Sequence, residues 1–154
     1  DGAKTADQCR HGIGQMSLTD FGLTFHHFGL AVRNIESARK VLEGMGYHCG
    51  EDVYDPLQEV MLVWCEHQTM PAVEIVAPTD NPGPLDSIVA ASDAAVYHLC
   101  YGAASIEASV AAIGEAGIRI IPVVPPKPAV LFGGKHVGFY QVRGFGLIEI
   151  VEDS

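Results

Sequence analysis

Short apolar runs and stretches of helix-spaced apolar residues follow one another along the first half of the chain. The apolar, aromatic run 25–32 predicts a strand. Asn34 then suits a helix N-cap, and the helically spaced apolar residues after it stop at Gly44 and Gly46, which are typical of a helix end. Further strands are predicted over 47–49, 60–65 and 72–76. The first half is therefore expected to form a βαβββ unit.

The same order of elements is predicted a second time. The segment 78–84, rich in proline, separates the halves and precedes a short helix expected over 85–92. Ser105 is expected to cap the main helix of the second half, and the proline run 125–128 is expected to open a loop. Strands are predicted over 96–101, 118–124, 137–142 and 147–151. The fold class expected is therefore α+β, with two tandem βαβββ modules.

The two halves also repeat one pair of residue types. His27 on the first strand recurs as His98, 71 residues later, and Glu74 on the last strand recurs as Glu149, 75 residues later. Each glutamate stands alone in a β-branched run, so its side chain points away from its apolar neighbours. Burying bare carboxylates is costly, and a cation removes that cost. His27, Glu74, His98 and Glu149 are therefore the candidate ligands of one divalent metal ion.

Composition narrows the function classes. The 154 residues are 48% hydrophobic, which is typical of a folded domain, and the formal net charge of −10 argues against a basic nucleic-acid surface. No apolar run approaches the length of about 20 residues that spans a membrane. We expect residues 1–24 to be an N-terminal extension and residues 25–154 to be a single domain, with modules at about 25–78 and 95–152.

The cysteines are scattered and form no C-x-x-C pair. This spacing predicts reduced, mostly buried thiols in a cytoplasmic protein. The residues concerned are Cys9, Cys49, Cys65 and Cys100.

Several segments around the candidate ligands resemble a known family. The vicinal oxygen chelate superfamily has paired βαβββ modules, and the resemblance implies that the two modules form a curved mixed sheet around a metal-binding cleft. Members of the superfamily include glyoxalase I, methylmalonyl-CoA epimerases, extradiol dioxygenases and bleomycin- and fosfomycin-resistance proteins. The local sequence is most similar to the epimerase branch over about residues 25–152. The segments that carry the resemblance are 27–32, 73–78, 97–100 and 146–150. The chain departs from that branch at Leu62, where some bacterial epimerases have a glutamate proposed as acid/base, and at 139–142, where epimerases commonly read Phe-x-His-Pro.

The resemblance implies a metal-dependent isomerase or epimerase of an α-acidic acyl thioester. It makes His27, Glu74, His98 and Glu149 the ligands of one Co, Ni, Mn or Zn ion, and Glu149 or Glu74 the catalytic acid/base. The ion would polarise a carbonyl and stabilise the enolate formed by loss of the neighbouring proton. The substrate would be a small molecule, with an acyl-CoA as the candidate. Lys135 and Gln141 are candidate substrate-binding residues, although each also suits a solvated loop or cleft position.

Other members of the superfamily remain as alternatives. A glyoxalase I-like lyase shares the ligand order His, Glu, His, Glu, and a non-catalytic binding or resistance protein uses the same cleft. An extradiol dioxygenase uses two histidines and one carboxylate, so Glu74 would crowd its site. We expect His26 to face the side of its strand opposite to His27. A homodimer is expected from the superfamily, with no membrane or nucleic-acid partner.

Overall fold

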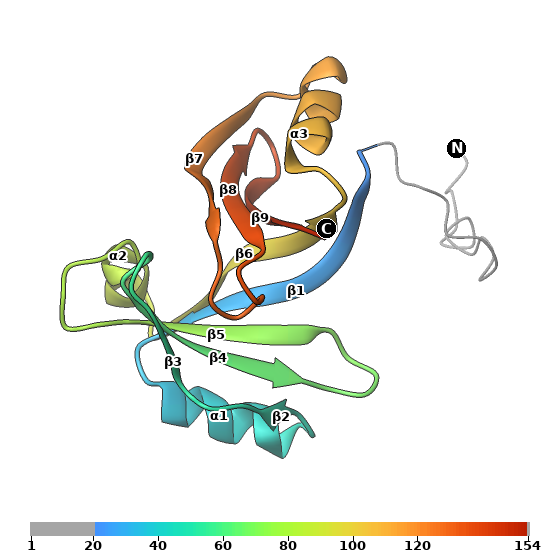
Figure 1. The fold of residues 1–154 in the computed structure, drawn as a ribbon. Coiled ribbons are helices and arrows are strands. Elements are labelled where there is room, and N and C mark those ends of the chain that lie inside the picture. The colour runs from blue at the N-terminus through green and yellow to red at the C-terminus, as the bar shows by residue number, and fades with distance from the viewer. Residues whose placement is uncertain (1–20, 154) are drawn as a thin grey trace, which may run out of the picture.

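The computed structural model describes residues 21–153, and Figure 1 shows their fold. Most of the expected N-terminal extension lies outside the described residues. The described residues form one nine-stranded sheet with three helices, which confirms the expected α+β class. No described helix is both long and apolar enough to cross a membrane.

The first module begins two residues before the predicted strand. Asn34 caps its helix as predicted, because its side chain accepts a hydrogen bond from the backbone N–H of Ser37 at 2.9 Å. Gly46 follows the helix with φ +94°, a left-handed conformation that favours glycine. The elements are β1 (Leu23–Val32), α1 (Ile35–Gly44), β2 (His48–Cys49), β3 (Val53–Asp55), β4 (Val60–Glu66) and β5 (Ala72–Pro78). The short strand β3 was not predicted.

The second module repeats this order after the short linker helix. Ser105 caps its helix by accepting a hydrogen bond from the N–H of Ala108 at 3.2 Å, as predicted. The elements are α2 (Asp86–Ala91), β6 (Ala94–Ala103), α3 (Ile106–Glu115), β7 (Ile120–Pro128), β8 (His136–Val142) and β9 (Gly146–Glu152). The loop predicted from the proline run 125–128 is wrong, because β7 continues to Pro128. This strand lies at the edge of the sheet, where missing N–H donors are tolerated.

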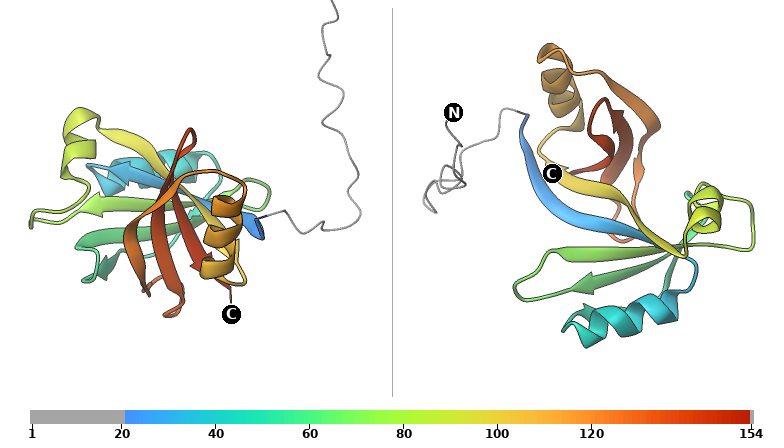
Figure 2. Two further views of the ribbon diagram at one scale, coloured as in Figure 1. Left: turned by 90° about the horizontal axis from the view of Figure 1, so that it is seen from above. Right: turned by 180° about the vertical axis from the view of Figure 1, so that it is seen from behind.

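The two modules join within the chain through their first strands. The strand order is β2-β4-β5-β1-β6-β9-β8-β7, with β3 paired to β4. β1 pairs with β6 in antiparallel orientation, and each of them has a parallel partner, β5 or β9, on its other side. Figure 2 shows β1 and β6 running side by side through the middle of the molecule. The sheet therefore has an approximate twofold relation about the β1–β6 seam.

Helices α1 and α3 cover the outer face of the curved sheet, whereas the residues around α2 pack with Leu62 and Val76 on the other face. Leu42 of α1 packs with Val73 and Ile75 of β5, and Ile106 of α3 packs with Ile148 and Ile150 of β9. In Figure 1, α1 lies below β4 and β5, while α3 lies outside the second half of the sheet. Since neighbouring strand residues face opposite sides, the residues between these apolar pairs point to the inner face.

The structure contradicts the expectation that the cysteines are reduced thiols. Cys49 of β2 and Cys65 of β4 face each other across the ladder and form a disulfide. Their separation of 16 residues gives no short sequence motif, so spacing alone did not reveal the bond. Cys100 is a free, buried thiol, as expected, and Cys9 lies outside the described residues.

Candidate metal centre

The repeated histidines and glutamates meet on the inner face of the sheet. His27 and His98 lie on the central strands β1 and β6, and the glutamates lie on the parallel partners of these strands, β5 and β9. Each glutamate stands between two outward-facing apolar residues, as the strand alternation predicted. The relative exposures are 0% for His27, 5% for Glu74, 1% for His98 and 2% for Glu149.

One atom from each of these side chains faces a common point. Their donor atoms all lie within 4.8 Å of one another. The Nε2 atoms of the two histidines are 3.5 Å apart. Oε2 of Glu149 lies 2.9 Å from His98 Nε2 and 3.5 Å from His27 Nε2, and Oε2 of Glu74 lies 3.7 Å and 3.6 Å from the same two atoms.

These separations suit a shared divalent ion. Two donor atoms that each lie about 2.1 Å from one ion are about 3.0 Å apart when the donor–ion–donor angle is a right angle. They are about 3.4 Å apart when that angle is tetrahedral. Oε2 of Glu149 is also buried, and its 2.9 Å contact with His98 Nε2 does not have the geometry of a hydrogen bond. A buried carboxylate oxygen without a hydrogen bond is costly unless a cation compensates for it. The residues present therefore fit a metal ion that takes imidazole and carboxylate ligands.

The electrostatics of the cluster favour a positive charge at its centre. Burial lowers the pKa of His27, but contacts with Glu149 and Glu74 raise it by more, to about 9. Burial alone would raise the pKa of Glu149, but its contacts with His27 and His98 outweigh burial and lower that pKa. Burial dominates at Glu74 and raises its pKa. A proton on His27 therefore offsets the negative charge of the two glutamates in the metal-free protein. A bound cation would offset the same negative charge.

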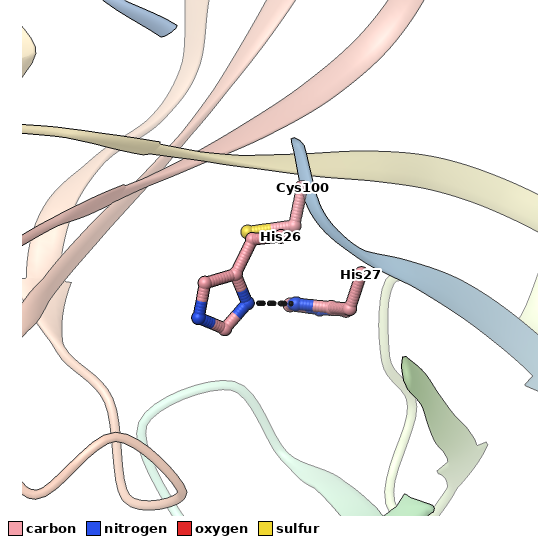
Figure 3. Close-up of side chains that lie close together, drawn as sticks. All are labelled: His26, His27 and Cys100. Atoms are coloured by element: carbon pink, nitrogen blue, oxygen red, sulfur yellow. Dashed lines mark hydrogen bonds between the residues drawn. The ribbon is translucent and has the colours of Figure 1, made fainter. Parts of the chain in front are cut away.

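The structure corrects the expected orientation of His26. The pairing of β1 with β6 shifts register between Phe25 and His27, so His26 is an extra, bulged residue. Its side chain consequently does not point to the face opposite His27. Figure 3 shows the two rings together, with His26 Nδ1 2.8 Å from His27 Nδ1 and Cys100 beside them. Sequence periodicity missed this contact because a bulge breaks the alternation of side chains.

Aromatic rings enclose the two histidines. The Trp64 and Phe132 rings lie 5.0 Å and 5.6 Å from the His27 ring. The Tyr97 and Phe139 rings lie 4.5 Å and 5.3 Å from the His98 ring. The cluster of two histidines and two glutamates is thus set in an apolar environment that strengthens electrostatic interactions.

A cavity of about 200 Å³ adjoins this aromatic surrounding. Tyr97 and Phe139, which contact His98, form part of its wall, and Gln58 also lines it. The predicted substrate-binding residues Lys135 and Gln141 do not line this cavity. Lys135 forms an ion pair with Asp153 at 3.0 Å, and Gln141 is exposed on β8.

The chain belongs to the Glyoxalase/Bleomycin resistance protein/Dioxygenase superfamily, whose sequence profile matches residues 26–139. This match confirms the expected family. No curated protein sequence matches the chain.

Several solved structures share the fold at low sequence identity. Methylmalonyl-CoA epimerase from Mycobacterium tuberculosis is 17% identical with a TM-score of 0.70, over 92% of this chain and 93% of that one. A hypothetical protein from Bacillus halodurans is 21% identical with a TM-score of 0.71, over 86% and 95%. A variant Streptomyces coelicolor methylmalonyl-CoA epimerase in complex with 2-nitronate-propionyl-CoA is 18% identical with a TM-score of 0.69, over 86% and 99%. At these identities the likeness establishes the fold alone.

Proposed function

We propose that this protein is a metal-dependent isomerase or epimerase of an α-acidic acyl thioester, similar in reaction to methylmalonyl-CoA epimerase. The convergence of His27, Glu74, His98 and Glu149 on one buried point is the observation that carries the proposal. The shared fold with methylmalonyl-CoA epimerases, one of them in complex with 2-nitronate-propionyl-CoA, supports this choice of reaction.

The four side chains would hold one divalent ion, of which Co, Ni, Mn and Zn are candidates. When bound, such an ion supplies a Lewis acid that polarises a carbonyl and stabilises negative charge developing beside it. The four side chains are at most 5% exposed, and the enclosing rings, including Trp64 and Phe132, would limit the access of water to the centre. Exclusion of water strengthens the attraction between the centre and a developing negative charge.

Proton movement at the α carbon would fall to the carboxylates. Epimerisation breaks the C–H bond, moves its electron pair into the carbonyl and returns a proton to the opposite face of the carbon. Glu74 and Glu149 come from opposite sides of the β1–β6 seam, which suits exchange of a proton at two faces. The raised pKa of Glu74, caused by burial, brings it closer to the pH at which a group both takes and gives a proton.

The cavity beside Tyr97 and Phe139 would hold a part of the substrate that does not react. Its lining is mostly apolar, with Val123, Val124 and Leu147 on the side of the second module. Lys135 and Gln141 remain proposed contacts for the polar end of the substrate, since both are on the second module and reach solvent.

Exchange of the α proton with solvent deuterium tests this proposal. Metal-loaded protein would be incubated in D₂O with methylmalonyl-CoA, other 2-substituted acyl-CoA esters and a glutathione hemithioacetal, and the products examined by mass spectrometry and NMR. We expect deuterium at Cα of an acyl-CoA ester. Glu74→Gln and Glu149→Gln should each slow exchange by about 10²–10⁴-fold, the usual contribution of a general acid/base.

Glu107→Gln is the matched control, because Glu107 is an exposed glutamate in the first turn of α3, far from the centre in the fold. This control should exchange at the unaltered rate. Conversion of the hemithioacetal to a thioester without acyl-CoA exchange would point to a glyoxalase I-like lyase. Tight binding of small molecules without any turnover would contradict the enzyme assignment and favour a binding protein.

A further inference from the structure

The two modules carry the same backbone irregularity directly before their inner-facing histidine. Pairing of β1 with β6 shifts between Phe25 and His27, which leaves His26 as an extra residue in β1. It shifts again opposite Gly29 and Leu30, where the extra residue is Tyr97 of β6. His26 and Tyr97 are 71 positions apart, as are His27 and His98, so the two β-bulges are copies of one feature.

The side chains at these equivalent positions differ in chemistry. Nδ1 of His26 lies 2.8 Å from Nδ1 of His27, within hydrogen-bond distance. The Tyr97 ring instead meets the His98 ring edge to face at 4.5 Å. Nδ1 of His98 is buried and has no hydrogen-bond partner among the described groups. Among the described residues, Nδ1 of His27 therefore has a polar side-chain partner, whereas Nδ1 of His98 has none.

The contact with His26 affects which nitrogen of His27 can bind a metal ion. An imidazole that binds a metal through Nε2 must present a free electron pair there, so its proton sits on Nδ1. His27 directs Nε2 to the centre and Nδ1 to His26. An N–H at His27 Nδ1 can donate to Nδ1 of His26, which then carries its own proton on Nε2.

We propose that His26 is a positioning residue that holds His27 in the Nδ1–H tautomer and in the ring orientation required for ligation. This role rests on the metal centre proposed above. Hydrogen-bond partners behind metal-binding histidines are a general means of fixing both properties, and their loss typically costs about 10–100-fold in metal affinity or activity. His98 is instead held by packing, between Tyr97, Phe139 and the bare Cα of Gly29.

A second metal site is the alternative explanation for this cluster. His26, His27 and Cys100 also place possible ligand atoms within 4.8 Å of one another (Figure 3). The Cys100 thiol already has a partner, because it lies within donating distance of the Tyr101 backbone carbonyl oxygen at 3.9 Å. A hydrogen bond between the two histidines explains their contact without a second ion.

Two substitutions separate the hydrogen bond from the packing of the ring. His26→Phe keeps an aromatic ring against Trp64 and Phe132 but removes the acceptor. His26→Asn loses the ring but places an acceptor oxygen near the former Nδ1. His136→Phe is the matched control, because His136 is an exposed histidine at the start of β8. The measurement is Zn²⁺ affinity and stoichiometry, by competition with a chromophoric chelator, on each metal-free full-length protein.

We expect His26→Phe to bind Zn²⁺ about 10–100-fold more weakly. His26→Asn should recover most of this loss, and His136→Phe should bind like the unaltered protein. In the Zn²⁺-loaded protein, the His27 Nδ1 proton should give a downfield NMR signal that is lost in His26→Phe and restored in His26→Asn. A purely structural role for His26 would not produce this signature.

Three results would overturn the inference. The first is unaltered affinity in His26→Phe, and the second is an equal loss in His26→Asn, which would assign the effect to packing. The third is a second Zn²⁺ equivalent that disappears in both His26→Phe and Cys100→Ala, which would make His26 a ligand. If the affinity series holds but no substrate exchanges its α proton, only the proposed reaction fails.

Discussion

The first and second modules present the same atoms to the centre of the molecule and different atoms behind them. Each contributes one histidine from a central strand and one glutamate from the parallel neighbour of that strand. Behind the histidines, however, His26 supports His27, whereas Tyr97 packs on His98. The duplication has therefore preserved the inner-facing donors while the surrounding residues diverged.

A second pair of equivalent positions shows the same divergence. Gly29 and Cys100 are 71 positions apart, and each lies beside the histidine of the other module. The absence of a side chain at Gly29 makes room for the His98 ring, while Cys100 fills the space beside His26 and His27. Packing thus positions His98, whereas the contact with His26 positions His27.

Among tests of the difference between the surroundings of His27 and His98, we expect the largest effect from Gly29→Ala. A Cβ at Gly29 would lie 2.1 Å from Cε1 of His98, so the ring must move. Because a displaced ligand costs more than a lost partner behind it, we expect metal affinity to fall by more than about 100-fold. Overpacking should also lower the free energy of unfolding by about 1–3 kcal/mol. Chelator competition and denaturant unfolding measure the two effects.

Gly114→Ala is the control for this substitution. A Cβ at Gly114 of α3 meets nothing within 4 Å. The control should leave metal affinity unchanged and raise the free energy of unfolding by about 0.5–1 kcal/mol, because alanine favours a helix over glycine. Unchanged metal affinity in Gly29→Ala would show that His98 does not depend on this space.

The disulfide distinguishes the modules at their outer strands. Cys49 faces Cys65 in the β2–β4 ladder, whereas Ile120 faces Val142 in the β7–β8 ladder. A bridge that closes a loop of this length contributes about 3 kcal/mol to stability. Reduction should therefore lower the free energy of unfolding by about that amount while one metal ion still binds.

The control for reduction is the double variant Cys49→Ala and Cys65→Ala. This variant should be less stable at the outset, and a reducing agent should have no further effect on it. Equal stability of the oxidised and reduced proteins in urea would contradict a structural role for the bridge.

The smallest expected effect, counted per pH unit, is the pH dependence of metal affinity. Burial lowers the pKa of His27, but Glu149 and Glu74 raise it to about 9, so below that pH a metal ion must displace a proton. Affinity should therefore rise with pH by about tenfold per unit below about pH 9. In the metal-free protein the same raised pKa stabilises the fold below about pH 6.5, and this contribution is lost as pH rises through about 9. Calorimetric titrations at several pH values would detect the trend, and a flat affinity between about pH 6.5 and 8.5 would contradict it.

The amino-acid sequence was sufficient to predict the modules and the inner-facing donors. The repeated His27/His98 and Glu74/Glu149 pairs and the helix caps Asn34 and Ser105 depend on local periodicity and spacing, which sequence reports directly.

The features that sequence missed depend on contacts between distant strands. The bulge at His26 arises from pairing of β1 with β6, and strand alternation along β1 alone predicts the wrong face. The Cys49–Cys65 bridge requires β2 to lie beside β4. The extension of β7 through its prolines depends on its position at the sheet edge.

Locating a bound ion tests the central claim most directly. Crystals of the Zn²⁺-loaded protein would be measured at the zinc absorption edge to give an anomalous difference map. We expect one peak per chain about 2.0–2.2 Å from donor atoms of His27, Glu74, His98 and Glu149. A peak at another site, or donors of these four residues turned away from one another around an empty centre, would contradict the account.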